Sequence, residues 1–340
     1  MELMQTVLEW LRLPRSVADG SIEWCSSAAI PGILLWSLGA WHVLRFLKRS
    51  IIGPRGIRVR SSLFLITGAS SGIGEALARD LVARGARVIL VARNATLLGK
   101  VASEMNAQHG AGQVVAHTIA ADCSNPADVD RLVNTCITTI GVPEAIVNCA
   151  GAGRWRYLHE MSAEEVKGCM DAPYFAAALV TRGFLPVFLE RNAGTFVNIQ
   201  SPAGYAPWSG STGYACTRFA LRGLCEALRA DLHNTGINVQ EVILAETASN
   251  YFSTNDNSLE RIPKIAALFG VLTVTDAAGY VVRAILSGEP VTCYNWRLAA
   301  AMYVHSWAPG LINASIRLTG WSIHKAPKVA VPPIANKKTN

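Results

Sequence analysis

The stretch ITGASSGIG, residues 66–74, links an apolar run to a helical pattern. The run before it, LFLIT, has the composition of a short buried strand, and residues 72–83 have the spacing of a helix. Gly68 allows a tight turn, while Gly72 and Gly74 let the backbone and the helix approach a ligand closely. The N–H groups and the positive dipole end of such a helix bind pyrophosphate, so the stretch predicts a dinucleotide site.

Six residues of this turn are the candidate phosphate-binding residues: Gly68, Ser70, Ser71, Gly72, Ile73 and Gly74. Glycine-rich turns also occur in proteins that bind no ligand, and a lone pattern of this kind is weak evidence. Here the strand, the turn, the helix and the next strand follow in the expected order. This context favours the dinucleotide interpretation.

Residues 61–290 alternate between strand-like and helix-like patterns. The strand-like runs are LFLITG, RVILVA, VVAHTIAA, EAIVNCAG, TFVNIQS and INVQEVIL, and helical runs such as AEEVKGCMDAPYFAAALVTRGFLPVFLE and YACTRFALRGLCEALRADLHNTG separate them. Short apolar strands that alternate with helices form parallel sheets with helices on both faces. We therefore predict a Rossmann-like, doubly wound α/β domain over residues 61–290.

The end of the second strand, VILVARNAT, indicates which dinucleotide is bound. A carboxylate at this point would accept a hydrogen bond from the ribose 2′-OH, but the chain has Arg93 and Asn94, which can donate to a 2′-phosphate. NADP(H) is therefore favoured over NAD(H), although Arg93 is also compatible with a solvated surface position. Asp122, after the third strand, is a candidate acceptor for the adenine amine or a turn residue that caps the next helix.

Four separated motifs carry a resemblance to the short-chain dehydrogenase/reductase family. They are the glycine-rich turn, NCAG at residues 148–151, Ser201 and Tyr214, and they occur in the family's order over about residues 63–243. The resemblance implies that Asn148, Ala150 and Gly151 form a turn beside the cofactor. It also implies that Ser201 hydrogen-bonds a substrate carbonyl while Tyr214 supplies the proton and NADP(H) exchanges the hydride.

The chain departs from the family's pattern at three places. Arg218 stands where the family has a lysine four residues after the tyrosine, and we include it among the catalytic and cofactor-binding candidates. An arginine keeps the positive charge that favours a phenolate, but it is a poor proton carrier. Pro173 replaces an asparagine of the family's proton relay. Leu244 and Ala245 replace a Pro-Gly pair, and Thr247 remains a candidate for contacting the nicotinamide carboxamide.

Three functional readings follow from this mixture of matches and departures. The preferred one is an active NADPH-dependent reductase, because losing one acid–base group typically costs about 10²–10⁴-fold in rate and leaves some activity. The alternative is a catalytically impaired membrane protein that binds the cofactor and has a scaffolding or regulatory role. A weaker third reading is an oxidoreductase that works in the oxidative direction on an alcohol.

The leader, residues 1–60, contains a candidate membrane anchor at residues 26–44. This run has no Asp, Glu, Lys or Arg, is just long enough to span a bilayer, and precedes a basic flank that begins at Arg45. The acidic residues lie before the run, so the positive-inside rule places the following domain in the cytosol. Pro31 and Gly32 interrupt the run and leave an interfacial segment as the alternative.

Residues 291–325 form a second apolar segment that is either another membrane segment or, as preferred here, a cap over a substrate pocket at the bilayer surface. Residues 326–340 are polar, contain prolines and are expected to be a disordered tail. The tail carries Lys337 and Lys338, which resemble a retrieval signal of the endoplasmic reticulum. The anchor and the apolar segment favour a lipid ketone. The chain resembles 3-ketodihydrosphingosine reductases, 3-oxoacyl-CoA reductases and microsomal steroid dehydrogenases, and no motif selects among them.

Composition excludes several other classes. Of the 340 residues, 51% are hydrophobic and only 16% are charged, which favours membrane contact. The net charge of +7 is concentrated after the leader's apolar run and in the tail, so we expect no nucleic-acid partner. The eight cysteines show no metal-ligand spacing, and we expect no metal. The resemblance makes a homodimer, formed through the helices that carry Pro173 and Tyr214, a candidate assembly.

Overall fold

The computed structural model describes residues 56–110, 112–249, 251, 261–320 and 322. The predicted anchor at residues 26–44, the tail at 326–340 and its two lysines lie outside the described residues. The chain divides into one unit of residues 1–53 and another of residues 54–340. The fold reported below is that of the second unit.

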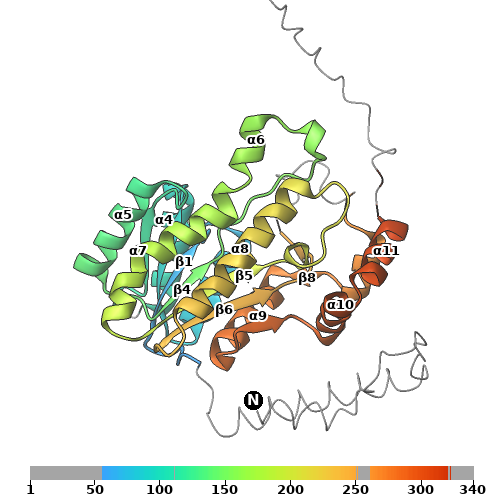
Figure 1. Cartoon of the computed structure of the whole chain (residues 1–340). Coiled ribbons are helices and arrows are strands. Elements are labelled where there is room, and N and C mark those ends of the chain that lie inside the picture. The colour runs from blue at the N-terminus through green and yellow to red at the C-terminus, as the bar shows by residue number, and fades with distance from the viewer. Residues whose placement is uncertain (1–55, 111, 250, 252–260, 321, 323–340) are drawn as a thin grey trace, which may run out of the picture. The chain divides into compact units, whose positions relative to one another are not determined.

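A single parallel sheet organises this unit. Within the described ranges it has seven strands in the order β3-β2-β1-β4-β5-β6-β9 (Figure 1). Their bounds are β1 Leu63–Thr67, β2 Arg87–Ala92, β3 Ala116–Ala120, β4 Ala145–Asn148, β5 Gly194–Gln200, β6 Ile237–Ile243 and β9 Val291–Cys293. The strand order changes direction between β1 and β4, the switch point where doubly wound folds bind ligands. The predicted fold class of the domain is confirmed.

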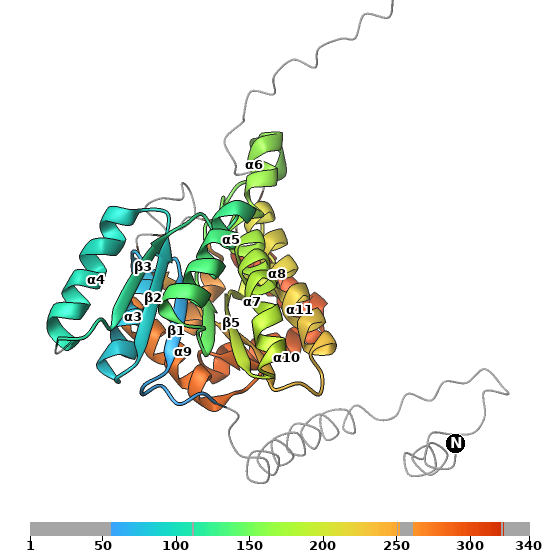
Figure 2. The same ribbon diagram turned by 90° about the vertical axis from the view of Figure 1, so that its left-hand side faces the viewer.

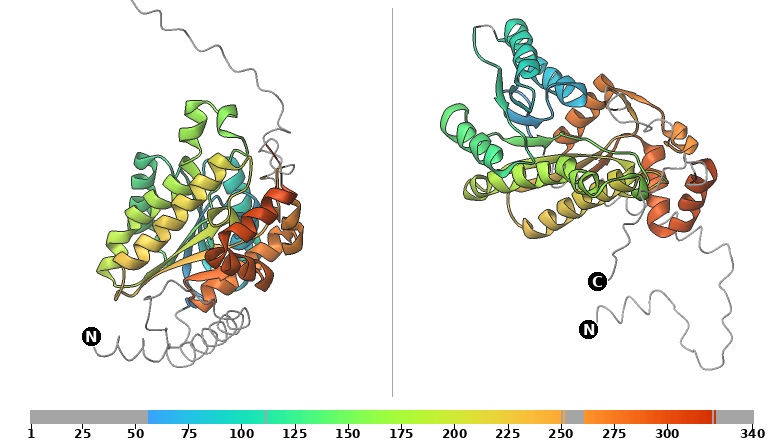
Figure 3. Two further views of the ribbon diagram at one scale, coloured as in Figure 1. Left: turned by 45° about the vertical axis from the view of Figure 1, so that its right-hand side comes forward. Right: turned by 90° about the horizontal axis from the view of Figure 1, so that it is seen from above.

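Helices cover both faces of the sheet (Figure 3). One face carries α3 Gly72–Ala83, α4 Ala95–His109 and α9 Val274–Ser287, and the other carries α5 Pro126–Thr135, α7 Ala176–Glu190 and α8 Thr212–Asp231. Successive strand residues point to opposite faces, so Phe64 and Ile66 pack in one core while Leu65 packs in the other. Burial on both faces explains why these strands are apolar throughout.

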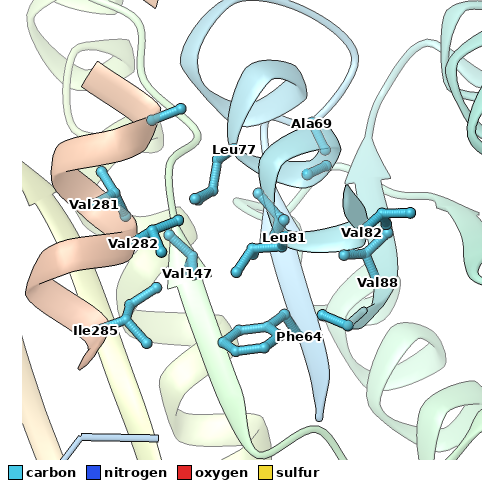
Figure 4. Close-up of a cluster of buried hydrophobic side chains, with 14 of the residues drawn as sticks. Phe64, Ala69, Leu77, Leu81, Val82, Val88, Val147, Val281, Val282 and Ile285 are labelled. Carbon is cyan, nitrogen blue, oxygen red and sulfur yellow. The ribbon is translucent and has the colours of Figure 1, made fainter. Parts of the chain in front are cut away.

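The core beneath α3 and α9 shows how the phosphate turn is held in place (Figure 4). Leu77 and Leu81 of α3 meet Phe64 of β1, while Val282 and Ile285 of α9 close the same cluster. All five side chains are buried. Truncating one of them to alanine would cost about 2–5 kcal/mol, so the helix that follows the turn is firmly anchored.

The long helical run predicted from Ala163 to Glu190 is interrupted. It forms α6 Ala163–Gly168, a π-helical turn η3 Asp171–Phe175 and α7. Ala172 has φ −133° and ψ 109°, which is extended rather than helical, because a proline disfavours the α conformation of the residue before it. By length and composition this run, with mean hydropathy 1.4, is the one candidate membrane span among the described helices. Its α7 part buries Val180 and Phe184 against the sheet, so we interpret it as a core helix.

The segment after residue 290, predicted to be a cap or a membrane segment, begins with a strand. Its first residues form β9, which pairs with β6 and extends the sheet beyond the six strands predicted from the sequence. Two helices follow, α10 Trp296–Trp307 and α11 Pro309–Thr319. They lie at the far end of the domain from α4 and α5 (Figures 1 and 2). A short parallel pair, β7 Thr247–Ala248 and β8 Leu272–Thr273, and the 3₁₀ helix η5 Lys264–Phe269 adjoin them.

Candidate functional site

A cleft of about 920 Å³ opens at the carboxyl ends of the strands. Its walls come from the segments that follow β1, β2, β3, β4, β5 and β6, and from η5, α10 and α11. Residues predicted from separate motifs therefore share one cavity. The cleft has a polar half around the glycine-rich turn and an apolar half beneath the C-terminal helices.

The glycine-rich turn has the geometry of a phosphate cradle. Gly68 and Gly72 have φ of +68° and +62°, a region that glycine occupies without steric cost. A Cβ on Gly74 would collide with the carbonyl oxygen of Gly68, so the helix can lie this close only with glycine there. Ser71 precedes α3 without capping it through its side chain. The start of α3 lines the cleft, so its first-turn N–H groups, which lack intrahelical partners, are candidate donors to an anion there.

Arg93 and Asn94 follow β2 and line the polar half of the cleft. Arg93 is exposed, with its guanidinium free to reach an anion at the rim. Asn94 plays a second role that the sequence analysis did not assign, because its Oδ1 accepts a hydrogen bond from Leu97 N at 3.0 Å and caps α4. Only its amide Nδ2 is left to donate to a ligand.

Asp122 lies after β3 and also lines the cleft. Its Oδ1 accepts hydrogen bonds from Ser124 N at 2.9 Å and from Ser124 Oγ at 2.6 Å. The side chain thus forms a turn, and the cap of α5 is Asn125 instead. Asp122 is a turn residue in the wall of the cleft, and the expectation that it caps the following helix is wrong.

The NCAG turn is held by residues that the sequence analysis missed. Thr67 Oγ1, at the end of β1, accepts hydrogen bonds from Cys149 N at 3.1 Å and Ala150 N at 3.0 Å. Asn148 Nδ2 donates to Asn198 Oδ1 of β5 at 2.9 Å. The sequence did contain a signal for the role of Thr67, because it is a polar residue at the end of an otherwise apolar strand. These bonds fix the turn, including Gly151, against the phosphate loop.

Ser201, Tyr214 and Arg218 meet in the middle of the cleft. Ser201 follows β5, and its Oγ accepts a hydrogen bond from Ala203 N at 3.2 Å. Tyr214 lies in the first turn of α8 and is 7% exposed. The guanidinium carbon of Arg218 lies 5.0 Å from the centre of the Tyr214 ring. The structure therefore brings together a hydroxyl, a phenol and a cation.

The side chain of Arg218 is buried and held by the sheet. It is 8% exposed, and its Nη1 donates to the carbonyl oxygen of Ile199 at 2.7 Å. Gln200 Nε2 donates to the backbone carbonyl of Arg218 at 2.9 Å, which ties α8 to β5. The Nε–H of Arg218 is buried and has no hydrogen-bond partner among the described residues. This donor is available to a bound molecule.

Aromatic side chains wall the site around Tyr214. Trp155 stacks on the Tyr214 ring at 5.1 Å between ring centres, with an angle of 23° between the planes. Trp155 Nε1 donates to Tyr251 Oη at 3.0 Å, and Trp208 packs against Trp155 at 5.2 Å. Burial raises the pKa of the Tyr251 phenol above its ordinary value, so this phenol stays neutral. These contacts fix the orientation of the Tyr214 ring.

A buried ion pair anchors this aromatic wall. Arg261 Nη1 lies 2.7 Å from Glu160 Oε2, and Arg261 Nη2 lies 3.0 Å from Glu160 Oε1. Arg261 Nη1 also donates to the carbonyl oxygen of Trp155 at 2.9 Å. The hydrogen bonds from Arg261 hold the pKa of the Glu160 carboxyl below its ordinary value. The two residues are 101 positions apart, so sequence spacing contained no signal for this pair.

Pro173 and Thr247 have structural partners near the site. The break at Ala172 exposes its carbonyl, which accepts a hydrogen bond from Ala152 N at 3.1 Å and fixes the loop after β4. Thr247 Oγ1 donates to the carbonyl oxygen of Ala245 at 3.2 Å and lines the cleft. Beside it lies Glu246, a cleft residue that sequence reasoning missed, and burial raises the pKa of its carboxyl.

The apolar half of the cleft is built mainly by residues beyond position 260. Its lining includes Ile262, Ile265 and Phe269 near η5, Leu298, Ala301 and Met302 of α10, and Ile312 and Ile316 of α11. A mainly apolar lining with a few polar groups is typical of small-molecule sites. The part of the chain that the structure describes contains no cluster of three His, Cys, Asp or Glu residues able to hold a metal.

Comparison with known proteins identifies relatives of the domain. Residues 62–259 match the sequence profile of short chain dehydrogenases. The chain is 27% identical over 302 residues to dehydrogenase/reductase SDR family member 7B of Bos taurus, covering 85% of this chain and 90% of that protein. It is 26% identical over 252 residues to 3-dehydrosphinganine reductase of Danio rerio, covering 74% and 76% of the two chains.

Among solved structures with the same fold, one contains NADPH and another contains NAD. A short-chain dehydrogenase from Sphingobium yanoikuyae in complex with NADPH superposes with a TM-score of 0.63 at 25% identity, covering 77% of this chain and 99% of that one. A short-chain dehydrogenase/reductase from Burkholderia phymatum in complex with NAD gives a TM-score of 0.65 at 23% identity, covering 75% and 96%. The second likeness shows the fold alone.

Proposed function

Because the chain belongs to the short-chain dehydrogenase family, we propose that it is an NADPH-dependent reductase of a lipid-like ketone, with Tyr214 as the proton donor. The observation that carries the proposal is the position of Ser201, Tyr214 and Arg218 between a polar phosphate cradle and an apolar pocket. A carbonyl at this point would lie where a nicotinamide and a lipid chain can meet. The long-chain and sterol classes both fit the apolar lining.

The residues present fit a dinucleotide. Glycine at position 74 lets α3 pack directly on the turn at Gly68, and the N-terminus of α3 supplies N–H donors that match a diphosphate. Arg218 Nε, a buried donor with no partner among the described residues, is suited to a ribose hydroxyl. Arg93 at the rim favours a 2′-phosphate, and hence NADPH over NADH. When bound, the cofactor supplies the hydride.

The chain's own residues provide orientation and the proton. Ser201 Oγ is the candidate donor to the substrate carbonyl oxygen, and the Tyr214 hydroxyl is the candidate donor of the proton to the developing alkoxide. Trp155 holds the Tyr214 ring by stacking, while Arg218 supplies positive charge next to it. Because an arginine stays protonated, the proton returns to Tyr214 from water or a neighbouring hydroxyl and not from Arg218.

The test is NADPH consumption by the detergent-solubilised full chain. We would offer 3-ketodihydrosphingosine, a long-chain 3-oxoacyl-CoA and a ketosteroid, and run Arg218→Lys beside the wild type. We expect turnover of one substrate class, and we expect the lysine variant to react at least as fast because an ammonium can exchange protons. If neither protein consumes NADPH with any of the three ketones although both bind it, the proposed reductase activity is contradicted.

A second candidate function is that of a cofactor-binding membrane protein with impaired catalysis and a scaffolding or regulatory role. The observation that favours it is the pairing of Pro173 with the immobilised Arg218, whose Nη1 is bound to the Ile199 carbonyl. This candidate predicts NADPH binding without turnover of any ketone. The ketone panel therefore separates the two functions directly.

The choice of dinucleotide has its own test. Arg93→Glu places a carboxylate where the arginine would meet a 2′-phosphate, so NADPH should bind at least tenfold more weakly, since charge-assisted pairs contribute roughly 1.5–3 kcal/mol. NADH, which lacks that phosphate, should bind as well as before or better. Titration of both dinucleotides by fluorescence measures this. An equal loss of affinity for NADPH and NADH would mean that Arg93 is a solvated surface residue with no role in recognising the 2′-phosphate.

For location, we infer an endoplasmic-reticulum membrane with the catalytic domain on the cytosolic side. The apolar run at residues 26–44, its basic flank and the lysines at the C-terminus support this inference. A homodimer is part of the same proposal. Protease protection in sealed microsomes tests the orientation, because a cytosolic domain is degraded without detergent.

A further inference from the structure

The C-terminal helices carry large apolar side chains on their outside. Six of them form what we call the apolar outer surface: Leu268, Trp296, Val304, Trp307, Leu311 and Leu318. Trp296, Trp307 and Leu318 are 75%, 69% and 86% exposed. Apolar groups of this size clustered on one part of a protein mark an interaction site.

The two sides of α10 are different. Trp296, Val304 and Trp307 are spaced by eight and eleven residues, which puts them on one side of a helix with 3.6 residues per turn. Leu298 and Met302 belong to the opposite side and line the cleft. One helix therefore separates the apolar half of the cleft from the apolar outer surface.

Hydrogen bonds join the elements that carry the surface. Arg297 Nη1 of α10 donates to the carbonyl oxygen of Leu268 at 3.4 Å, and its guanidinium carbon lies 5.8 Å from the centre of the Trp296 ring. Ile265 N of η5 donates to Thr319 Oγ1 of α11 at 3.4 Å. The surface is thus carried by one packed assembly of η5, α10 and α11, and other residues of the same three elements line the apolar half of the cleft.

The two segments that carry this surface contain basic residues and no acidic ones. Residues 291–340 contain no Asp or Glu at all, and neither do residues 261–275. Arg297 and Arg317 are exposed on α10 and α11 next to the apolar side chains. Tryptophans, aliphatic side chains and arginines without acidic neighbours are the composition of segments that lie at an anionic membrane interface.

We propose that the apolar outer surface docks on an anionic lipid bilayer. The inference rests on the proposed function, because docking would place the helices that line the apolar half of the cleft against the leaflet that holds a lipid ketone. The leucines and tryptophans enter the interface, and Arg297 and Arg317 pair with lipid phosphates and carboxylates. Substrate then passes between α10, α11 and η5 without crossing water.

The test measures the exposure of two side chains in the full chain by hydroxyl-radical oxidation. Trp296 and Trp307 are compared on phosphatidylcholine vesicles with and without phosphatidylserine, so residues 1–55 are present in both samples. We expect oxidation of both tryptophans to fall when phosphatidylserine is present. Two arginines near an anionic surface should strengthen docking by roughly 30-fold in total.

Variants separate docking from general membrane association. Leu311→Ser with Leu318→Ser should leave Trp296 and Trp307 oxidisable on the anionic vesicles, because the variant removes two apolar side chains of the docking surface. Neither leucine lines the cleft, so NADPH binding should not change. Leu97→Ser with Val114→Ser, which alters exposed apolar residues elsewhere, is the matched control and should keep the protection. Arg297→Gln with Arg317→Gln should abolish the preference for phosphatidylserine. NADPH binding verifies that each variant is folded.

Several results would overturn the proposal. Tryptophans that stay equally oxidisable on both kinds of vesicle would remove the anionic lipid surface as the occupant. Protection that rises with protein concentration in the absence of vesicles would identify a second copy of the chain instead. The readout needs no turnover, so an inactive protein with protected tryptophans would sink the proposed reductase and keep the docking surface. An active protein whose tryptophans stay oxidisable would support the proposed reductase and contradict the docking surface.

Discussion

Tyr214→Phe is expected to lower kcat by roughly 10²–10⁴-fold and to leave NADPH binding unchanged. The substitution removes the hydroxyl that is to donate the proton. It keeps the ring that stacks on Trp155 at 5.1 Å and faces the Arg218 guanidinium at 5.0 Å. The cleft should therefore keep its shape. Steady-state kinetics with the ketone found by the substrate panel, together with NADPH titration, measure both quantities.

Tyr280→Phe is the matched control for this prediction. Tyr280 lies in α9, packs edge-on against Tyr294 at 5.2 Å and does not line the cleft. Its variant should retain wild-type kcat. Wild-type turnover by Tyr214→Phe would remove Tyr214 from the mechanism, and with it the main argument for catalysis.

Arg261→Met should lower the free energy of unfolding by about 3 kcal/mol, near the lower end of what losing one partner of a buried ion pair costs. The variant leaves the Glu160 carboxylate buried without its bidentate partner, and it also removes the hydrogen bond to the Trp155 carbonyl. Denaturant unfolding of the detergent-solubilised chain measures the loss. The aromatic wall should loosen too, so substrate KM is expected to rise.

The comparison for Arg261→Met is Arg84→Met. Arg84 forms an ion pair with Asp80 at 2.7 Å on the outside of α3, where water screens both charges. Surface pairs contribute at most about 1 kcal/mol, so this loss should be small. Equal losses in the two variants would mean that the buried pair has no special role. Adding Glu160→Gln to Arg261→Met should recover part of the stability, because no unpaired charge then remains.

The same pair predicts a pH dependence. Arg261 holds the pKa of Glu160 below its ordinary value of 4.5, so the folded state prefers the ionised carboxylate. The resulting stabilisation is complete above pH 4.5 and is lost as the pH falls through the lowered pKa. Wild type and Arg261→Met should therefore converge in stability under acid. A difference that stays constant down to pH 2 would contradict this origin.

Arg218 illustrates how far residue type and spacing can be interpreted. Its position four residues after Tyr214 on a helix predicted a cation near the phenol, and the two side chains do lie together. The four-residue spacing did not predict the direction of the Arg218 guanidinium. The Ile199 carbonyl holds Nη1, so the arginine is fixed by the end of β5.

The sequence alone was sufficient for six strands of the sheet, the glycine-rich turn and the order of the motifs. These features depend on local sequence: short apolar runs in strands that are buried on both faces, glycine where a Cβ collides, and the helix that begins at Gly72 as predicted. The break at Ala172 was also present in the sequence as Pro173, but the long apolar pattern on both sides obscured it. The predicted anchor and tail remain predictions.

Only the tertiary structure decided which distant residues form the rest of the site. Glu160 meets Arg261, Thr67 holds the turn at Cys149, and β9 joins the sheet through β6 although it lies in the segment assigned to the cap. Such pairings depend on how the elements are brought together in space, and the separation of two residues along the chain does not encode that. Most strands and helices could be predicted from the local sequence, because their conformation depends on neighbouring residues. The walls of the cleft could not, because they form only when distant elements pack together.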